Sequence, residues 1–248
     1  MRSFWPIYKR ELFAFFVTPL AWVLITVFLF VQGMHFFLLV DHFSNPQGGA
    51  SDQTPIQAFF GNTILLYLVL FLLVPPMTMR LFAEERRSGT IEVLMTSPVT
   101  ETQVVVGKFL AALTFYMFLW LPTLIYVAVV QHYSSVDWGP VGASFLGILG
   151  IGAVFVSAGV FASSVSRNQV VAASLAFAIL ILLFSFGVLE NLFNAQWLKQ
   201  GFAYLDLWSH MDDFSKGIVN TRRLVYCASL TVFFLFLSAR ALEANKWR

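Results

Sequence analysis

Six stretches of the chain are apolar over lengths close to those that cross a bilayer. About twenty residues of helix span the roughly 30 Å hydrocarbon layer. The stretches cover residues 20–40, 59–79, 109–130, 141–165, 170–189 and 224–237, and the last reaches a spanning length if it continues to Leu242. The first five contain no Asp, Glu, Lys or Arg. The pattern predicts an all-α polytopic membrane protein with six transmembrane helices.

A separate amphipathic helix is predicted ahead of the first span, over residues 1–17. The apolar arc covers about 120° at 100° per residue, and Arg10 and Glu11 are expected to point away from it. The arc consists of Phe4, Trp5, Tyr8, Leu12, Phe15 and Phe16. Such a helix lies in the headgroup plane, whereas residues 18–248 form the transmembrane domain. The alternative is that residues 1–17 begin the first span, but Thr18-Pro19 favours a break.

Two capping boxes predict helices that start before their apolar parts. Thr54-Pro55-Ile56-Gln57 starts the second helix, and Thr100-Glu101-Thr102-Gln103 starts the third. Continued to Arg87, the second helix is about 49 Å long at 1.5 Å per residue, which exceeds the hydrocarbon thickness. Pro75-Pro76 is expected to bend it.

The segment between the second and third spans contains several residues that typically end a helix. Gly89 suits a helix C-cap, and Ser97-Pro98 ends a short amphipathic turn over residues 90–95. Just before Gly89 stand Glu84, Glu85, Arg86 and Arg87. This predicts a helix, a small knuckle and a helix over residues 81–103. The alternative is that the charges only anchor helix ends at the headgroups.

Basic residues give the orientation, because short cytoplasmic loops hold Lys and Arg in excess. Loops 41–58 and 131–140 contain none, and loop 190–223 has four basic and four acidic residues. The other connections and the termini hold Arg2, Lys9, Arg10, Arg80, Arg86, Arg87, Lys108, Arg167, Arg240, Lys246 and Arg248. Both termini are predicted to be cytoplasmic, with 190–223 as an extracytoplasmic loop.

Composition narrows the class of protein. Of 248 residues, 58% are apolar and only 11% charged, against roughly 25% charged in a soluble domain. The excess apolar surface must face lipid. The net charge of +2 argues against a nucleic-acid partner. The single Cys227 excludes an intrachain disulfide.

Candidate chemistry is sparse. Asn62, Thr63, Tyr67, Thr114 and Tyr116 could line a pathway, or could only satisfy neighbouring helix bonds. A helix capped by Asp206 could be an external lid or an interfacial support. No metal site is predicted, although His35, His42 and His132 fall near the external side together with Asp41 and Asp137. The most enzyme-like cluster consists of Asp206, His210, Asp212 and Asp213.

Two motifs carry a family resemblance. The run at residues 84–99, followed by Gly107-Lys108-Phe109, resembles the cytoplasmic segment of ABC type 2 permeases. Near the other end, His210, residues 214–219, Thr221-Arg222 and Tyr226 resemble the gliding-motility branch, which is related to the nitrous-oxide-reductase maturation permease. Asn220 departs from that branch, where Asp precedes Thr221.

The resemblance implies the type 2 exporter permease fold in a bacterial inner membrane. Two permeases, identical or different, would pair with two ATPases, and an extracytoplasmic auxiliary subunit could join them. Residues expected to couple to the ATPase are Glu84, Glu85, Arg86, Arg87, Gly89, Thr90, Glu92, Leu94, Ser97 and Pro98. The chain has no Walker sequence, so ATP and Mg are used by the partner, and no directly bound cofactor and no catalytic residue are expected. The alternatives are a polytopic membrane enzyme and a non-transporting anchor.

Overall fold

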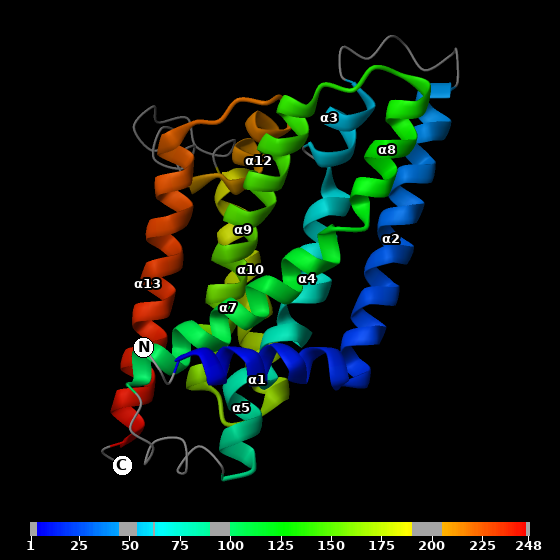
Figure 1. The fold of residues 1–248 in the computed structure, drawn as a ribbon. Coiled ribbons are helices and arrows are strands. Elements are labelled where there is room, and N and C mark those ends of the chain that lie inside the picture. Colours follow the sequence, from blue (N-terminus) through cyan, green and yellow to red (C-terminus); the bar gives the residue numbers. More distant parts are fainter. Residues whose placement is uncertain (1–3, 45–53, 62, 90–99, 190–204, 247–248) are drawn as a thin grey trace.

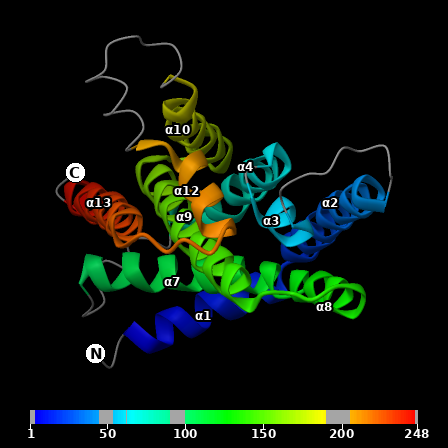
Figure 2. The same ribbon diagram turned by 90° about the horizontal axis from the view of Figure 1, so that it is seen from above.

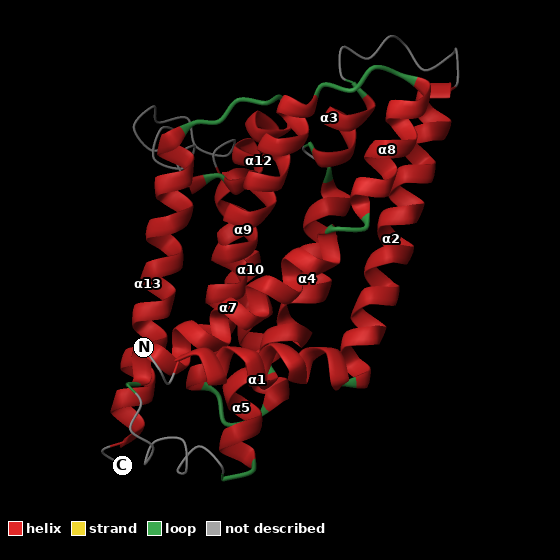
Figure 3. Ribbon diagram, viewed as in Figure 1, coloured by secondary structure: helices red, strands yellow, loops and turns green. Residues whose placement is uncertain are grey.

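The computed structural model describes residues 4–44, 54–61, 63–89, 100–189 and 205–246. Every regular element in these ranges is a helix (Figure 3). Six of the described segments are long and apolar enough to cross a membrane: Pro19–Ser44, Pro55–Arg87, Glu101–Tyr133, Trp138–Val165, Gln169–Gly187 and Thr221–Ala244. The predicted all-α, six-span architecture is confirmed.

The helices form an upright bundle with a short helix lying across one end (Figure 1). In chain order they are α1 (Phe4–Val17), α2 (Pro19–Ser44), α3 (Pro55–Phe60), α4 (Ile64–Thr78), α5 (Arg80–Arg87), α7 (Glu101–Trp120), α8 (Thr123–Tyr133), α9 (Trp138–Val165), α10 (Gln169–Leu189), α12 (Leu207–Ser215) and α13 (Thr221–Lys246). We call the end that carries α1 and α5 the basal end, and the end that carries α3 and α12 the apical end.

The first helix is separate from the first span, as Thr18-Pro19 predicts. α1 ends at Val17, α2 begins at Pro19, and the two helices meet at a sharp angle (Figure 1). α1 lies alongside α7 across the base of the bundle (Figure 2). Phe15 stacks on Phe115 with ring centroids 5.0 Å apart. This placement suits the predicted headgroup-plane position, which stays a prediction.

Two predicted continuous helices are interrupted. The helix expected from Pro55 to Arg87 breaks at Gly61, whose backbone is extended, and again at Met79. Pro75 and Pro76 lie inside α4. The third span breaks at Leu121 and Pro122, and α8 is a distinct half-helix. The prediction of one uninterrupted helix is therefore wrong for the second span, because the Gly61 backbone leaves the helical region. Both predicted capping boxes are confirmed.

α9 is the central element, and it contacts α4, α5, α7, α10, α12 and α13. Its small residues allow close approach, as expected where lipid offers no hydrophobic drive between helices. Gly147 faces Phe214, Gly152 faces Tyr116 and Gly159 faces Thr78. The small side chains of α9 therefore seal contacts within one chain.

At the apical end, the predicted helix over residues 206–217 is confirmed. The Asp206 carboxylate accepts hydrogen bonds from the amides of Trp208 (2.9 Å) and Ser209 (3.1 Å). Gly217, with φ of +82°, follows its last turn. Tyr67 donates its hydroxyl to the Leu207 carbonyl at 2.9 Å. The Tyr67 bond links α12 to α4, and the buried apolar side chains of α12 pack against the bundle. The lid and the support interpretations of α12 both stay predictions.

Gly159→Ala should lower the free energy of unfolding by about 1–3 kcal/mol, because its Cβ would collide with the Thr78 side chain. The measurement is the thermal unfolding midpoint of the purified protein in detergent. Gly142→Ala, on the same helix with open space around the new Cβ, is the control and should be neutral or slightly stabilising. Equal midpoints for the two variants would contradict the tight α4–α9 contact.

Candidate functional site

α5 projects from the bundle at the basal end, beside α1 (Figure 1). α5 begins inside the protein, with Leu81, Phe82 and Ala83 buried. It ends exposed at Arg87, Ser88 and Gly89. α5 is thus a short rod with its base held in the bundle and its tip outside.

The buried amine of Lys108 on α7 holds this region together. Lys108 is only 1% exposed. Its Nζ donates to the Leu81 carbonyl at 2.7 Å and to Glu85 Oε1 at 2.9 Å, and lies 3.1 Å from Glu11 Oε1. Three acceptors thus surround the three ammonium hydrogens, as burial of a charge requires. One cation thereby joins α1, α5 and α7.

Arg10 extends these contacts into a four-residue network. Its guanidinium lies 2.8 Å from Glu11 Oε1 and 3.3 Å from Glu85 Oε1. The hydrogen bond to Glu11 raises the pKa of Arg10, against the opposing effect of partial burial. We call Arg10, Glu11, Glu85 and Lys108 the basal charge cluster; it has two charges of each sign.

The prediction that Glu11 points away from the packed side of α1 is wrong. The Glu11 side chain is 13% exposed and faces Lys108, whereas Arg10 is 60% exposed. The physical reason is the buried ammonium, which needs a counter-charge from each neighbouring helix. At 100° per residue, Glu11 lies only about 20° from Phe4, at the edge of the apolar arc, so the wheel itself places Glu11 beside the packed side. The wheel does not identify the partner on α7.

The base of α5 is also bonded to α9 through Ser163. Its Oγ accepts from the amides of Phe82 (3.0 Å) and Ala83 (3.2 Å), and donates to the Met79 carbonyl at 2.9 Å. Amides in the first turn of a helix lack intrahelical partners, so one hydroxyl satisfies two of them. Arg86 adds a hydrogen bond from Nη1 to the Val165 carbonyl at 3.2 Å. α5 is therefore tied to the C-terminal end of α9.

Arg80 connects α5 to the junction between α1 and α2. Its Nη2 donates to Thr18 Oγ1 at 2.8 Å, and its guanidinium lies 5.7 Å from the Phe15 ring centroid. Thr18 in turn donates to the Ala14 carbonyl. A cavity of about 320 Å³ lies beside these groups and beside Lys108. The basal end thus has both charged bonds and open space between α1 and α5.

The predicted coupling residues divide into two groups. Glu84 and Arg87 are exposed, whereas Glu85 and Arg86 turn toward the protein. Gly89 has φ of +72°, which confirms the predicted C-cap. Thr90, Glu92, Leu94, Ser97 and Pro98 lie outside the described residues.

The described pathway candidates bond to backbone or to a neighbouring helix. Thr63 donates to the Ala58 carbonyl at 3.2 Å, and Tyr116 donates to the Ile148 carbonyl at 3.4 Å. Thr114 lies 3.1 Å from the Tyr8 hydroxyl. Tyr67 is the residue that holds α12, and Asn62 lies outside the described residues. That these residues line a pathway stays a prediction.

The enzyme-like cluster at the apical end is engaged in structural contacts. Asp206 caps α12, Asp212 lies 2.5 Å from the Lys216 amine, and Asp213 pairs with Arg223. The ring of His210 is buried edge-on against the ring of Tyr226, with ring centroids 5.3 Å apart. Burial, aided by nearby Arg223 and opposed by Asp206, lowers the His210 pKa to about 4. The arrangement stabilises a short helix.

The three histidines near the apical end contact different aromatic rings. His35 stacks on Phe59. His42 lies against Phe43, and His132 lies against Tyr133. Within the described ranges, no group of three metal-ligating side chains gathers.

Five residues of the site are missing from the predicted set: Arg10, Glu11, Arg80, Lys108 and Ser163. Lys108 offers a usable signal, because it stands eight residues after the Thr100 cap and directly before an apolar stretch. A lysine at that position must find partners inside the protein or reach the interface. In the sequence, Ser163 and Gly159 appear only as a pair of small residues four positions apart, which gives no indication of the bond to α5.

The sequence profile of a family described as "ABC-2 family transporter protein" matches residues 5–241. No curated protein matches the chain. The profile match includes all six apolar spans and every residue of the basal charge cluster.

Lys108→Met should destabilise the protein by about 3 kcal/mol, because Glu11 and Glu85 lose their shared buried counter-charge. Thermal unfolding in detergent measures the loss. Exposed Lys9→Met is the control and should change the midpoint little. Adding Glu85→Gln to Lys108→Met should recover part of the loss; full additivity of the two changes would contradict the network.

Stability should fall as the pH decreases from about 6.5 toward 4. Unfolded His210 binds a proton near its ordinary pKa of about 6.5, whereas the folded ring resists protonation until about pH 4. The unfolded state therefore gains protons first, and acid favours it. Thermal unfolding between pH 7.5 and 5 should show a smaller decline for His210→Gln than for the wild type. Parallel profiles would refute the role of His210.

Proposed function

Because the chain belongs to the ABC-2 transporter family, we propose that it is the permease subunit of an exporter driven by a separate ATPase. It is a multi-pass membrane permease component of an ABC transporter. The ATPase would dock on the segment that begins at the tip of α5 and ends at the Thr100 cap of α7. The single observation that carries this proposal is the fixation of α5 in the basal charge cluster.

The contacts of α5 would make that segment an effective coupling element. Its base is bonded to Lys108 of α7 and Ser163 of α9, and its tip is exposed. A displacement applied beyond Gly89 would therefore move α7, α9 and, through the basal charge cluster, α1 as one body, as in rigid-body switching. The segment in this proposal includes the predicted contacts Thr90, Glu92, Leu94, Ser97 and Pro98.

The charge distribution supports a cytoplasmic basal end. Arg10, Arg80, Arg86 and Arg87 lie there, and so do the first described helix, α1, and the C-terminal end of α13 (Figure 1). The positive-inside rule then places both termini in the cytoplasm and α12 outside. A bacterial plasma membrane is the proposed location.

The assembly we propose contains two permeases and two ATPases. The ATPases would supply ATP and Mg chemistry, because the permease has no Walker sequence. A substrate pathway would form between the permeases, and Asn62, Thr63, Tyr67, Thr114 and Tyr116 remain its proposed polar residues. An extracytoplasmic auxiliary subunit would contact the α12 end.

Gly89→Val should uncouple the ATPase from the permease. A β-branched residue strongly disfavours a φ of +72°, so the docking segment would leave α5 in another direction. The assay uses the permease co-purified with its ATPase and reconstituted in liposomes. We expect a severalfold loss of permease-stimulated ATP hydrolysis.

Gly142→Val is the matched control, because this glycine on α9 has a negative φ and open space around it. Its stimulation should equal that of the wild type. Full stimulation by Gly89→Val would overturn the proposed docking segment. A pull-down that recovers the permease without any ATPase would favour the anchor alternative.

A further inference from the structure

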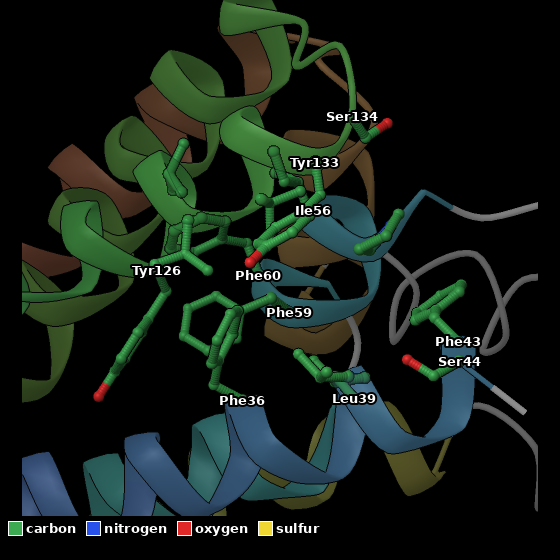
Figure 4. A pocket seen from close by; sticks show the side chains of 15 residues that line it. Phe36, Leu39, Phe43, Ser44, Ile56, Phe59, Phe60, Tyr126, Tyr133 and Ser134 are labelled. Atoms are coloured by element: carbon green, nitrogen blue, oxygen red, sulfur yellow. The ribbon is translucent and has the colours of Figure 1, made fainter.

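A large apolar groove lies at the apical end, far from the basal charge cluster. It has a volume of about 600 Å³ and is lined by α2, α3 and α8 with the turns next to them. Figure 4 shows aromatic and aliphatic side chains from these helices converging on one space. The volume falls in the range of about 300–1,000 Å³ that is typical of small-molecule sites.

The groove exists because two spans are broken. α8 departs from the line of α7 at Leu121 and Pro122, and α3 ends at Gly61. Phe59 and Phe60 of α3 are buried and form one wall. The groove therefore lies beside the breaks in the second and third spans.

The inner end of the groove is aromatic and tightly packed. Phe36 stacks on Tyr126 with centroids 4.7 Å apart, and Phe59 lies edge-on to Tyr126 at 5.7 Å. Behind Phe59, the His35 ring stacks on it at 5.1 Å. These rings form a fixed floor that offers almost no polar surface to an occupant.

The outer end, in contrast, carries hydroxyl groups. Ser44 at the end of α2, and Tyr133 and Ser134 at the end of α8, lie at this mouth (Figure 4). From Phe36 to Ser44 the helix rises about 12 Å at 1.5 Å per residue. The groove is therefore mainly apolar along its length, with hydroxyl groups gathered at its outer end; the Tyr126 hydroxyl of the inner floor lies beside Gly33 of α2.

We propose that this groove binds one acyl chain of a phospholipid from the leaflet at the apical end. The chain would occupy the apolar length, and the glycerol and headgroup would lie at the hydroxyl mouth. An apolar cavity does not hold water well, so hydrocarbon is the occupant that its lining favours. The half-exposed walls, Val40 (44%) and Val129 (40%), leave the groove open at its side, through which a chain enters without unfolding any helix.

A helix of a second copy fits these observations less well. The inner floor is closed by rings from three helices, and the polar groups at the mouth match the junction between a lipid chain and its headgroup. A site for a bound lipid also differs from the proposed ATPase docking, which takes place at the opposite end of the molecule.

The test uses a phospholipid with a photoreactive diazirine near the end of one acyl chain. The full-length purified protein is reconstituted in liposomes containing this lipid, without nucleotide, and illuminated. Peptide mapping by mass spectrometry then locates the labels. Labels should be more frequent at Phe36, Phe59 and Tyr126 than at equally apolar, lipid-facing positions such as Phe30. An even distribution over these positions would overturn the proposal.

Filling variants sharpen the result. Leu39→Trp fills the groove from α2, and Val129→Trp fills it from α8. Each should reduce floor labelling severalfold. The neighbouring variants Leu38→Trp and Ile125→Trp lie outside the groove and should label like the wild type. Retained labelling of the floor residues in both filled proteins would reject the site. Wild-type labelling decides the case if a filled variant fails to fold.

Discussion

A single buried ammonium organises the basal half of this protein. Lys108 is placed where desolvation would be costly, and the contacts of Glu11, Glu85 and the Leu81 carbonyl offset that cost. Because these acceptors come from two other helices, the charge can be satisfied only when α1, α5 and α7 are assembled together. The orientation of the N-terminal helix is thus dictated by an electrostatic requirement as well as by its apolar side chains.

The rest of the fold depends on how closely helices can approach α9. Gly152 and Gly159 bring Tyr116 and Thr78 against its backbone, and Ser163 bonds the first turn of α5. Small residues therefore serve two purposes on this helix. They provide close packing in the middle of the bundle, and at the basal end they provide the hydroxyl that fixes the charged segment.

Local signals predicted most of the architecture. Apolar runs, the Thr54 and Thr100 capping boxes, the Thr18-Pro19 break and the Gly89 cap depend on neighbours in sequence, and the structure agrees with each. The breaks at Gly61 and Pro122 were missed because apolar runs do not record where a helix bends inside a membrane. The partner of Glu11 was missed for a different reason: Lys108 is 97 positions away, and only tertiary packing brings them together.

The linkage of α1 to α5 has a consequence for the surrounding membrane. α1 is 14 residues long, about 21 Å at 1.5 Å per residue, and exposes Trp5 and Phe13 on the side away from α7. Arg10 bonds the Glu85 carboxylate of α5, and Glu11 bonds the Lys108 amine that also holds α5. If α5 moves as proposed and α1 lies among the headgroups as predicted, each movement of α5 pulls α1 through the lipid headgroups. The viscosity of the bilayer would then oppose each cycle, and lipid composition would affect the work that the ATPase must do.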